Sequence, residues 1–331
     1  MDPNVREWMV VARPGVQHTE IMTHQSQPAI AVSGLTKTYG ERRVVDALTL
    51  DIPRGETFAL LGPNGAGKST TVGLLTGTVR PSAGTARVLG TDPLTADRAA
   101  RARVGIVPQV SGETGPYTVA ELVRHFATLY PNPRDPDQVI AAVGLERHAD
   151  ARVGKLSGGQ QRRVDVALGI IGTPEVLFLD EPTTGFDPEA RHQFWGLIAS
   201  LQEEGTTILL TTHYLEEAAR LADRAGVIAS GQLVAVDTVA ALGGPGARTP
   251  LVRWRDASGE MREERTDTPG AAVARLVASA GGGAGGEPAD LEVIRPSLED
   301  IYLALIGLDR ASAFAEAPSD TFATTAQEGT A

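Results

Sequence analysis

The sequence predicts a doubly wound α/β core followed by a smaller α+β domain. Two short apolar runs, at 175–179 and 207–211, are rich in leucine or β-branched residues and are typical of buried parallel strands. Helical stretches at 188–203 and 215–223 alternate with them, and this alternation indicates a parallel sheet covered by helices. A further apolar strand at 57–61 runs directly into a glycine-rich loop, which places a ligand site at one edge of that sheet.

The first part of the chain predicts a flexible leader and then a small β region. Residues 1–28 show no hydrophobic period. After them, 30–35 and 44–52 predict short strands on either side of a turn at Tyr39 and Gly40. We therefore expect the main domain to begin at residue 29.

The middle and the C-terminal part predict a helical region, a linker and a small domain. Residues 109–156 are mainly helical in pattern, with a proline-rich break at 131–136. Gly243, Gly244 and Gly246 around Pro245 indicate a linker, so the main domain is expected to span 29–242. A small α+β domain is expected over 251–309, and the Ala/Thr/Ser-rich tail at 310–331 predicts disorder. Its expected elements are strands at 251–255 and 291–294 and helices at 271–280 and 298–305.

Composition excludes several classes of protein. The chain has 331 residues, no cysteine and a net charge of -11. Without cysteine there can be no disulfide framework and no thiolate metal site. The negative charge, most of it C-terminal to residue 251, argues against nonspecific binding to nucleic acid or to anionic lipid. No apolar run reaches the roughly 18–20 residues of a membrane span, so the sequence predicts a soluble protein, and the lack of cysteine fits a reducing cytoplasm.

The glycine-rich loop fits the pattern G-x-x-x-x-G-K-[ST]. Its residues are Gly62, Pro63, Asn64, Gly65, Ala66, Gly67, Lys68 and Ser69. Glycines let backbone N–H groups turn inward around phosphate oxygens, and the N-terminus of the following helix adds positive charge. Lys68 is expected to neutralise the β and γ phosphates, and Ser69 to bind Mg²⁺.

Two adjacent carboxylates end the strand at 175–179. A carboxylate at the carboxyl end of a strand lies where ligands bind in open α/β sheets. Asp180 is therefore suited to hold Mg²⁺, and Glu181 to polarise the water that attacks the γ-phosphate. A strand that merely ends in solvated acids is the alternative, and the phosphate loop argues against it.

A third motif lies between the first two and narrows the class. It is the pentapeptide Leu156, Ser157, Gly158, Gly159 and Gln160. A serine hydroxyl and free N–H groups at a helix start can bind phosphate. With the phosphate loop and the aspartate-tipped strand, this pentapeptide resembles the signature of the ATP-binding subunits of ABC transporters, over roughly residues 30–240. The resemblance implies a P-loop ABC ATPase core with an antiparallel β subdomain and a helical subdomain, and ATP and Mg²⁺ as cofactors.

The resemblance also implies roles for further residues. Tyr39 would stack on adenine, although a tyrosine that simply occupies a turn remains an alternative. Gln109 would sense Mg²⁺ and the attacking water while touching the membrane partner, and His213 would be the switch histidine that reaches the γ-phosphate. Asp187 fits the loop that crosses the dimer interface. The ATP-contacting residues it implies are Tyr39, Gly62, Pro63, Asn64, Gly65, Ala66, Gly67, Lys68, Ser69, Thr70, Ser157, Gly158, Gly159, Gln160 and Asp187.

Two departures from the family pattern are visible. Phe186 stands where leucine is usual, and we expect this apolar exchange to alter packing only. The segment 111–117, after Gln109, is glycine-rich and less hydrophobic than in many family members. Because that region would face the permease, the choice of partner is the property these residues affect.

Length and motif order separate branches of the family. One phosphate loop and one signature argue against the tandem-cassette translation factors. Lys68 and Ser157 are 89 residues apart with no long heptad run between them, unlike relatives that insert a coiled coil there. The segments 211–218 and 296–302 resemble the daunorubicin-resistance type of multidrug exporter ATPase.

The sequence therefore predicts a homodimeric ATPase at the cytoplasmic face of the cell membrane. Each ATP would lie between the phosphate loop of one subunit and the signature of the other. The membrane-spanning part would be a separate permease chain, and the cargo a drug-like or other hydrophobic compound. A non-transport ATPase acting on a soluble complex and a regulatory nucleotide-binding module remain as alternatives.

Overall fold

The computed structural model describes residues 27–109, 115–256, 258–279 and 288–307. The disorder expected at 310–331, and the leader expected at 1–28 except for its last two residues, fall outside this part. Within the described residues, no helix is both long and apolar enough to cross a bilayer.

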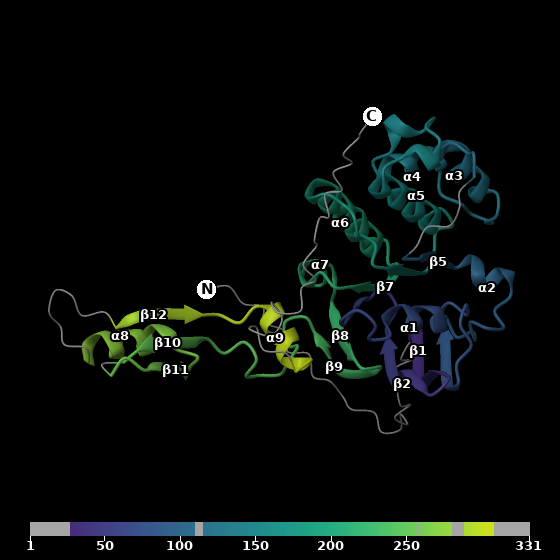
Figure 1. The fold of residues 1–331 in the computed structure, drawn as a ribbon. Helices are drawn as coiled ribbons and strands as arrows, with labels where there is room; N and C mark the ends of the chain where they lie inside the picture. Colours follow the sequence, from purple (N-terminus) through teal and green to yellow (C-terminus); the bar gives the residue numbers. More distant parts are fainter. Residues whose placement is uncertain (1–26, 110–114, 257, 280–287, 308–331) are drawn as a thin grey trace, which may run out of the picture.

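The core is a six-stranded sheet in the order β5-β6-β7-β3-β8-β9 (Figure 1). Its first five strands in that order are parallel, and β9 closes the edge antiparallel to β8. The strands are β3 (Thr57–Leu61), β5 (Val104–Val107), β6 (Val176–Asp180), β7 (Thr207–Thr212), β8 (Arg224–Ala229) and β9 (Gln232–Thr238). This is the doubly wound arrangement that the alternating pattern predicts.

Successive side chains of the buried strands point to opposite faces of the sheet, and the core therefore forms two apolar clusters. In β6, Leu177 and Leu179 face one cluster, while Val176 and Phe178 face the other. All four side chains are fully buried, because helices or a second sheet cover both faces. Helices α5 (Gly158–Ile170) and α6 (Pro188–Glu203) contribute to the first cluster, and α1 (Lys68–Leu75) contributes to the second.

A three-stranded antiparallel sheet and a group of helices flank the core at opposite ends (Figure 1). The sheet has the order β2-β1-β4, with bounds β1 (Ile30–Tyr39), β2 (Arg42–Ile52) and β4 (Ala83–Val88). The helical end contains α3 (Val119–Ala127), α4 (Pro136–Ala142) and α5. A capping box at Thr118 and Glu121 fixes the start of α3. The short elements are α2 (Arg98–Ala102), which lies beside β5, and η1 (Glu146–His148) and η2 (Val153–Lys155), which contact α4 and α5.

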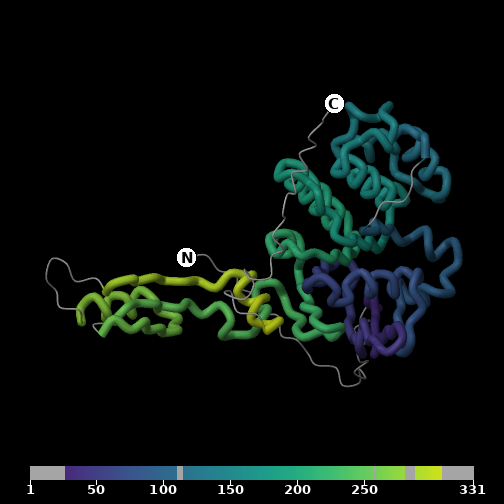
Figure 2. The backbone as a smooth tube through the Cα atoms, viewed as in Figure 1, coloured from purple at the N-terminus to yellow at the C-terminus, as the bar shows by residue number. Residues whose placement is uncertain are grey.

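The C-terminal elements form a separate antiparallel sheet in the order β11-β10-β12 with α8 beside it. Their bounds are β10 (Leu251–Arg255), β11 (Met261–Arg265), α8 (Pro269–Ser279), β12 (Ala289–Ile294) and α9 (Leu298–Leu305). This sheet projects from the core. The chain then returns, and α9 lies against the core (Figure 2). Leu298, Tyr302 and Leu305 pack on the main apolar cluster, near α7 (Leu215–Leu221). The domain boundaries proposed from the sequence stay a prediction.

Candidate active site

The motifs predicted from the sequence meet at one edge of the parallel sheet. Leu61 pairs with Thr212, and Asp180 pairs with Thr211, so the carboxyl ends of β3, β6 and β7 are level. β5 ends beside β6 and leads to Gln109. Polar residues that follow four different strands are therefore brought together, as expected for an open α/β sheet.

The phosphate loop depends on glycine for its shape. Gly67 has φ 108° and precedes α1, and a Cβ built there would lie 2.5 Å from the carbonyl oxygen of Val44 on β2. A Cβ on Gly62 would lie 2.4 Å from the carbonyl oxygen of Ile228. The loop is thus wedged between β2 and β8, and an L side chain at either position would displace backbone.

Lys68 is buried at the start of α1. Its ammonium donates hydrogen bonds to the carbonyl oxygens of Gly62, at 2.7 Å, and Pro63, at 3.2 Å, and lies 3.7 Å from Oε1 of Glu181. Burial lowers the pKa of Lys68, and the nearby Glu181 and Asp180 carboxylates oppose this shift. The loop's own carbonyls thus hold a cation at the place where phosphate would need one.

Three oxygen atoms beside Lys68 fit a magnesium ion. The hydroxyl of Ser69 lies 3.2 Å from Oδ1 of Asp180 and 3.5 Å from Oε1 of Gln109. Mg²⁺ prefers oxygen ligands at about 2.1 Å in octahedral geometry, which separates neighbouring ligands by roughly 3 Å. Thr211 donates to the same Asp180 oxygen and helps to fix it. The hydroxyl, amide and carboxylate present are therefore a suitable donor set.

Glu181 occupies the centre of the site in a strained backbone conformation. Its φ is 48°, a region that non-glycine residues rarely adopt and that is often found at functional sites. Its N–H donates to the carbonyl oxygen and the hydroxyl of Thr211. Oε2 accepts a hydrogen bond from Nε2 of Gln109 at 3.1 Å and lies 3.5 Å from Nδ1 of His213. A carboxylate that faces Gln109 and His213 in this way can accept a proton from a positioned water.

The signature sequence is built as a helix start. Ser157 is the N-cap of α5, and its hydroxyl accepts the N–H of Gln160, whose side chain accepts the N–H of Ser157 in return. The side-chain nitrogen Nε2 of Gln160 lies 3.1 Å from Nε2 of His148. Ser157 and Gly158 are exposed, so the serine hydroxyl and the first free N–H groups of the helix face outward.

Arg162, which belongs to none of the predicted motifs, joins the signature helix to the loops that contain Pro108, Asp180 and Pro182. It is 5% exposed, and its guanidinium donates to three backbone carbonyl oxygens. The acceptors are those of Pro108, Asp180 and Pro182. Burial lowers the pKa of Arg162, while the carboxylates of Asp165, Asp180 and Glu181 oppose the shift. The only hint in the sequence is an arginine in the first turn after the signature.

A depression of about 620 Å³ lies beside the signature and the segment that contains Asp187. Asp187 is the N-cap of α6, accepting the N–H of Ala190 at 2.8 Å. Phe186 packs edge-on against Phe194, a packing role as expected. Among the described residues, none from 62 to 69 lines this depression. Gln109, whose side-chain oxygen lies 3.5 Å from the Ser69 hydroxyl, does line it, so the depression borders the group beside the phosphate loop as well as the signature.

The remaining predicted ATP-contacting residues lie in the phosphate loop, at the start of α1 or at the end of β1. Tyr39 ends β1 with its ring 52% exposed and the Lys37 ammonium 4.7 Å from the ring centre. It pairs with Arg42, two residues before the Val44 that touches the loop. Pro63 and Asn64 are exposed at the loop tip, and Thr70 is half-buried in α1. The Tyr39 side chain is therefore exposed at the end of β1, with Lys37 over its ring, and its stacking on adenine stays a prediction.

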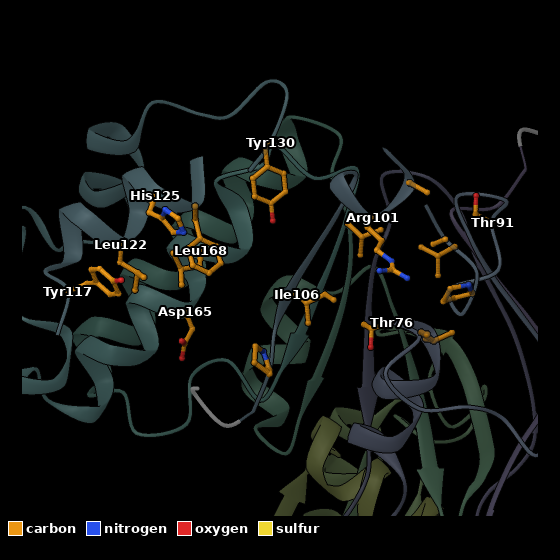
Figure 3. Close-up of a pocket in the computed structure, with 18 of the residues that line it drawn as sticks. Thr76, Thr91, Arg101, Ile106, Tyr117, Leu122, His125, Tyr130, Asp165 and Leu168 are labelled. Carbon is orange, nitrogen blue, oxygen red and sulfur yellow. The ribbon is translucent and has the colours of Figure 1, made fainter. Parts of the chain in front are cut away.

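A largely apolar cavity of about 730 Å³ separates the core from the helical end (Figure 3). Tyr117, Leu122 and His125 line it on the helical side. Arg101 and Ile106 line it on the core side. Ile106 and Tyr117 are 40% and 52% exposed, so the cavity is open to solvent.

Comparison with known proteins gives a consistent result. The family model described as ABC transporter matches residues 45–184. The chain is 42% identical over 308 residues to Nod factor export ATP-binding protein I of Ralstonia nicotianae, covering 85% of this chain and 95% of that protein. It is 40% identical over 250 residues to the daunorubicin/doxorubicin resistance ATP-binding protein DrrA of Streptomyces peucetius, covering 74% and 76%.

Solved structures agree with this likeness. An ATP-binding subunit of an ABC transporter is 27% identical with a TM-score of 0.59, and the match covers 63% of this chain and 90% of that one. A dimeric bacterial ABC transporter cassette is 25% identical with a TM-score of 0.56, covering 63% and 98%.

Proposed function

Because this chain belongs to the ABC transporter family and is an ATPase, we propose that it energises the export of a drug-like or other hydrophobic compound through a separate membrane permease. The observation that carries the proposal is the meeting of Lys68, Ser69, Asp180, Gln109 and Glu181 at one edge of the sheet. These are the groups that phosphoryl transfer to water requires.

The geometry supports one division of labour among these residues. Lys68 exchanges its bonds to the loop carbonyls for phosphate oxygens. Ser69, Asp180 and Gln109 would hold Mg²⁺, and the bound ion would supply positive charge beside the phosphates. Glu181 accepts the proton of the attacking water at Oε2, the oxygen that Gln109 and His213 already face. His213 completes the site on the side of the γ-phosphate.

We further propose that two copies of the chain pair head to tail. The signature opens onto a depression that none of the described phosphate-loop residues lines, and this supports a phosphate partner for Ser157 from a second chain. A second copy supplies one, and the same contact repeats at the symmetry-related site. Asp187 lies beside the signature and would meet the partner across this interface.

The apolar cavity between the core and the helical end supports a permease as the second partner. It borders the core on one side and the signature helix on the other, through Leu168 of α5 (Figure 3). Pro108, which accepts from Arg162, is also part of its lining. A permease segment seated there would therefore act on Gln109 and on the signature helix together. Membrane contact would occur only through the permease, at the cytoplasmic face.

The proposal of a hydrophobic cargo rests on the relatives whose names include Nod factor export and daunorubicin resistance. The segments 211–218 and 296–302 carry the same likeness. The second lies at the start of α9, where Ser297 and Asp300 form a capping box and Leu298 packs on the main core. A soluble complex as the partner is the alternative.

Glu181→Gln tests the catalytic part of the proposal. We expect this variant to bind ATP, to lose about 10²–10⁴-fold in turnover, and to accumulate as an ATP-bound dimer. Size-exclusion chromatography with and without ATP, together with phosphate release, measures both effects. Brisk turnover would refute the general base. Co-purification of a stable complex without a membrane protein would favour the soluble alternative.

A further inference from the structure

Glu217 is a fully buried carboxylate that none of the steps above uses. It is the third residue of α7 and has no exposed surface. Neither of its carboxylate oxygens makes a hydrogen bond of ordinary geometry within the described residues. An uncompensated buried carboxyl is costly, and such a group in a native fold calls for an explanation.

Other buried polar atoms without partners gather around it. The hydroxyl of Thr183, the indole N–H of Trp195 and Nε of Arg191 are all buried and unbonded within the part described. Burial raises the pKa of Glu217, and the hydroxyls of Thr212 and Thr183 and the indole of Trp195 act against this rise. The donors and the acceptor are therefore neighbours, and small side-chain rotations would pair them.

The neighbours belong to the two segments that hold the reacting groups. Thr183 lies two residues after Glu181, and Thr212 directly precedes His213. The hydroxyl of Thr212 accepts the N–H of Tyr214 at 2.9 Å, which leaves its own proton free to donate. Tyr214 is the N-cap of α7, and in a capping box the third helical residue, here Glu217, would accept the N–H of Tyr214. Because Thr212 accepts that N–H instead, Glu217 does not cap the helix.

An ion pair does not explain the carboxylate either. Arg191 exerts the weakest of the influences on its pKa. The guanidinium of Arg191 lies over the ring of Tyr214, 4.6 Å from the ring centre. The charge of Arg191 is thus directed to an aromatic face, and the hydroxyls and the indole remain as the partners of Glu217.

We propose that Glu217 is a positioning residue that joins the segment after Glu181 to the segment before His213, through Thr183 and Thr212, and keeps the two reacting groups in register. The 3.5 Å separation between Oε2 of Glu181 and Nδ1 of His213 is the distance that this link maintains. Hydrogen-bonded networks in a low-dielectric interior are rigid when every member is satisfied. A shift of about 1 Å at a reacting group can cost on the order of 10²-fold in rate.

The inference rests on the roles proposed for Glu181 and His213, and it predicts a specific kinetic pattern. The link touches neither the phosphate loop nor Tyr39, so Glu217→Ala should lower kcat by at least about tenfold and change KM for ATP by less than about twofold. Glu217→Gln should stay within about threefold of wild type, because an amide can still accept from Trp195 and donate to a threonine. Thr183→Val, which removes one hydroxyl, should lower kcat by about three- to tenfold.

The experiment measures kcat, KM for ATP and thermal unfolding of the full chain for these variants. Glu216→Ala is the matched control, because Glu216 is the adjacent glutamate and is exposed; it should behave as wild type. Wild-type kcat in Glu217→Ala overturns the proposal. If that variant fails to fold, Thr183→Val decides, and a wild-type kcat there overturns it too. Glu181→Gln is assayed in parallel. If it keeps wild-type turnover, the general-base role of Glu181 is wrong, and this outcome is distinct from a failure of the Glu217 proposal.

Discussion

Removal of the Arg162 guanidinium should disable the enzyme without altering any residue that touches ATP. Arg162→Met keeps the apolar stem and leaves three carbonyl oxygens without their donor. Breaking a buried charged network of this kind costs about 3–5 kcal/mol, less than the simple sum of three bonds to a charged group. Two of the carbonyls, those of Asp180 and Pro182, flank Glu181 in sequence, so turnover should fall by more than about tenfold.

Arg163→Met is the matched control for this change. Arg163 is the next residue of α5 and is half-buried. Its guanidinium makes long bonds of 3.4 Å to the carbonyl oxygens of Val143 and Gly144 and lies 5.8 Å from the centre of the Phe186 ring. Its loss should cost about 0.5–1.5 kcal/mol. Urea unfolding gives the stability of both variants, and phosphate release at a temperature where both are folded gives turnover. Equal effects of the two substitutions would refute the reasoning.

Two further predictions concern the phosphate loop and the buried carboxyl. Gly67→Ala places a Cβ 2.5 Å from a backbone oxygen at φ 108°, so ATP affinity should fall by more than about tenfold in calorimetry, and unchanged affinity would contradict the account of the loop. Burial raises the pKa of Glu217, so the folded chain binds the carboxyl proton of Glu217 more tightly than the unfolded chain does. The stability that this difference contributes is full at acidic pH and is lost as pH rises through the raised pKa. Glu217→Gln should therefore gain stability relative to wild type as pH rises above the ordinary glutamate pKa of 4.5 in urea unfolding, and a pH-independent difference would contradict this.

The position of the site could be predicted because each motif follows a strand. Asp180 and Glu181 end β6, and His213 follows β7, so the level ends of parallel strands bring them together. The glycine pattern predicted the loop for a different physical reason. Only glycine tolerates the close approach of β2 to residue 67. The ATP-binding roles of individual residues stay predictions.

Other features depend on contacts between distant residues and left little trace in the sequence. Arg162 bonds a carbonyl oxygen 54 residues away, and no local pattern indicates that an arginine on a helix will turn inward. Strand β11 is an exposed edge strand held by pairs such as Arg253 with Glu263, so its charged sequence lacks an apolar period. Glu217 and Glu216 are adjacent and identical in type, and only the packing of α7 decides which is buried.

The most direct test of the account is whether the ATP site is shared between two chains. Lys68→Ala removes the phosphate contact, and Ser157→Arg blocks the signature, so each variant alone should be inactive. Mixed one to one, half of the dimers contain one site with both Lys68 and Ser157 intact, and about a quarter of wild-type ATPase activity should return. A mixture as inactive as its parts, although the two chains are found in the same dimers, would contradict the shared site.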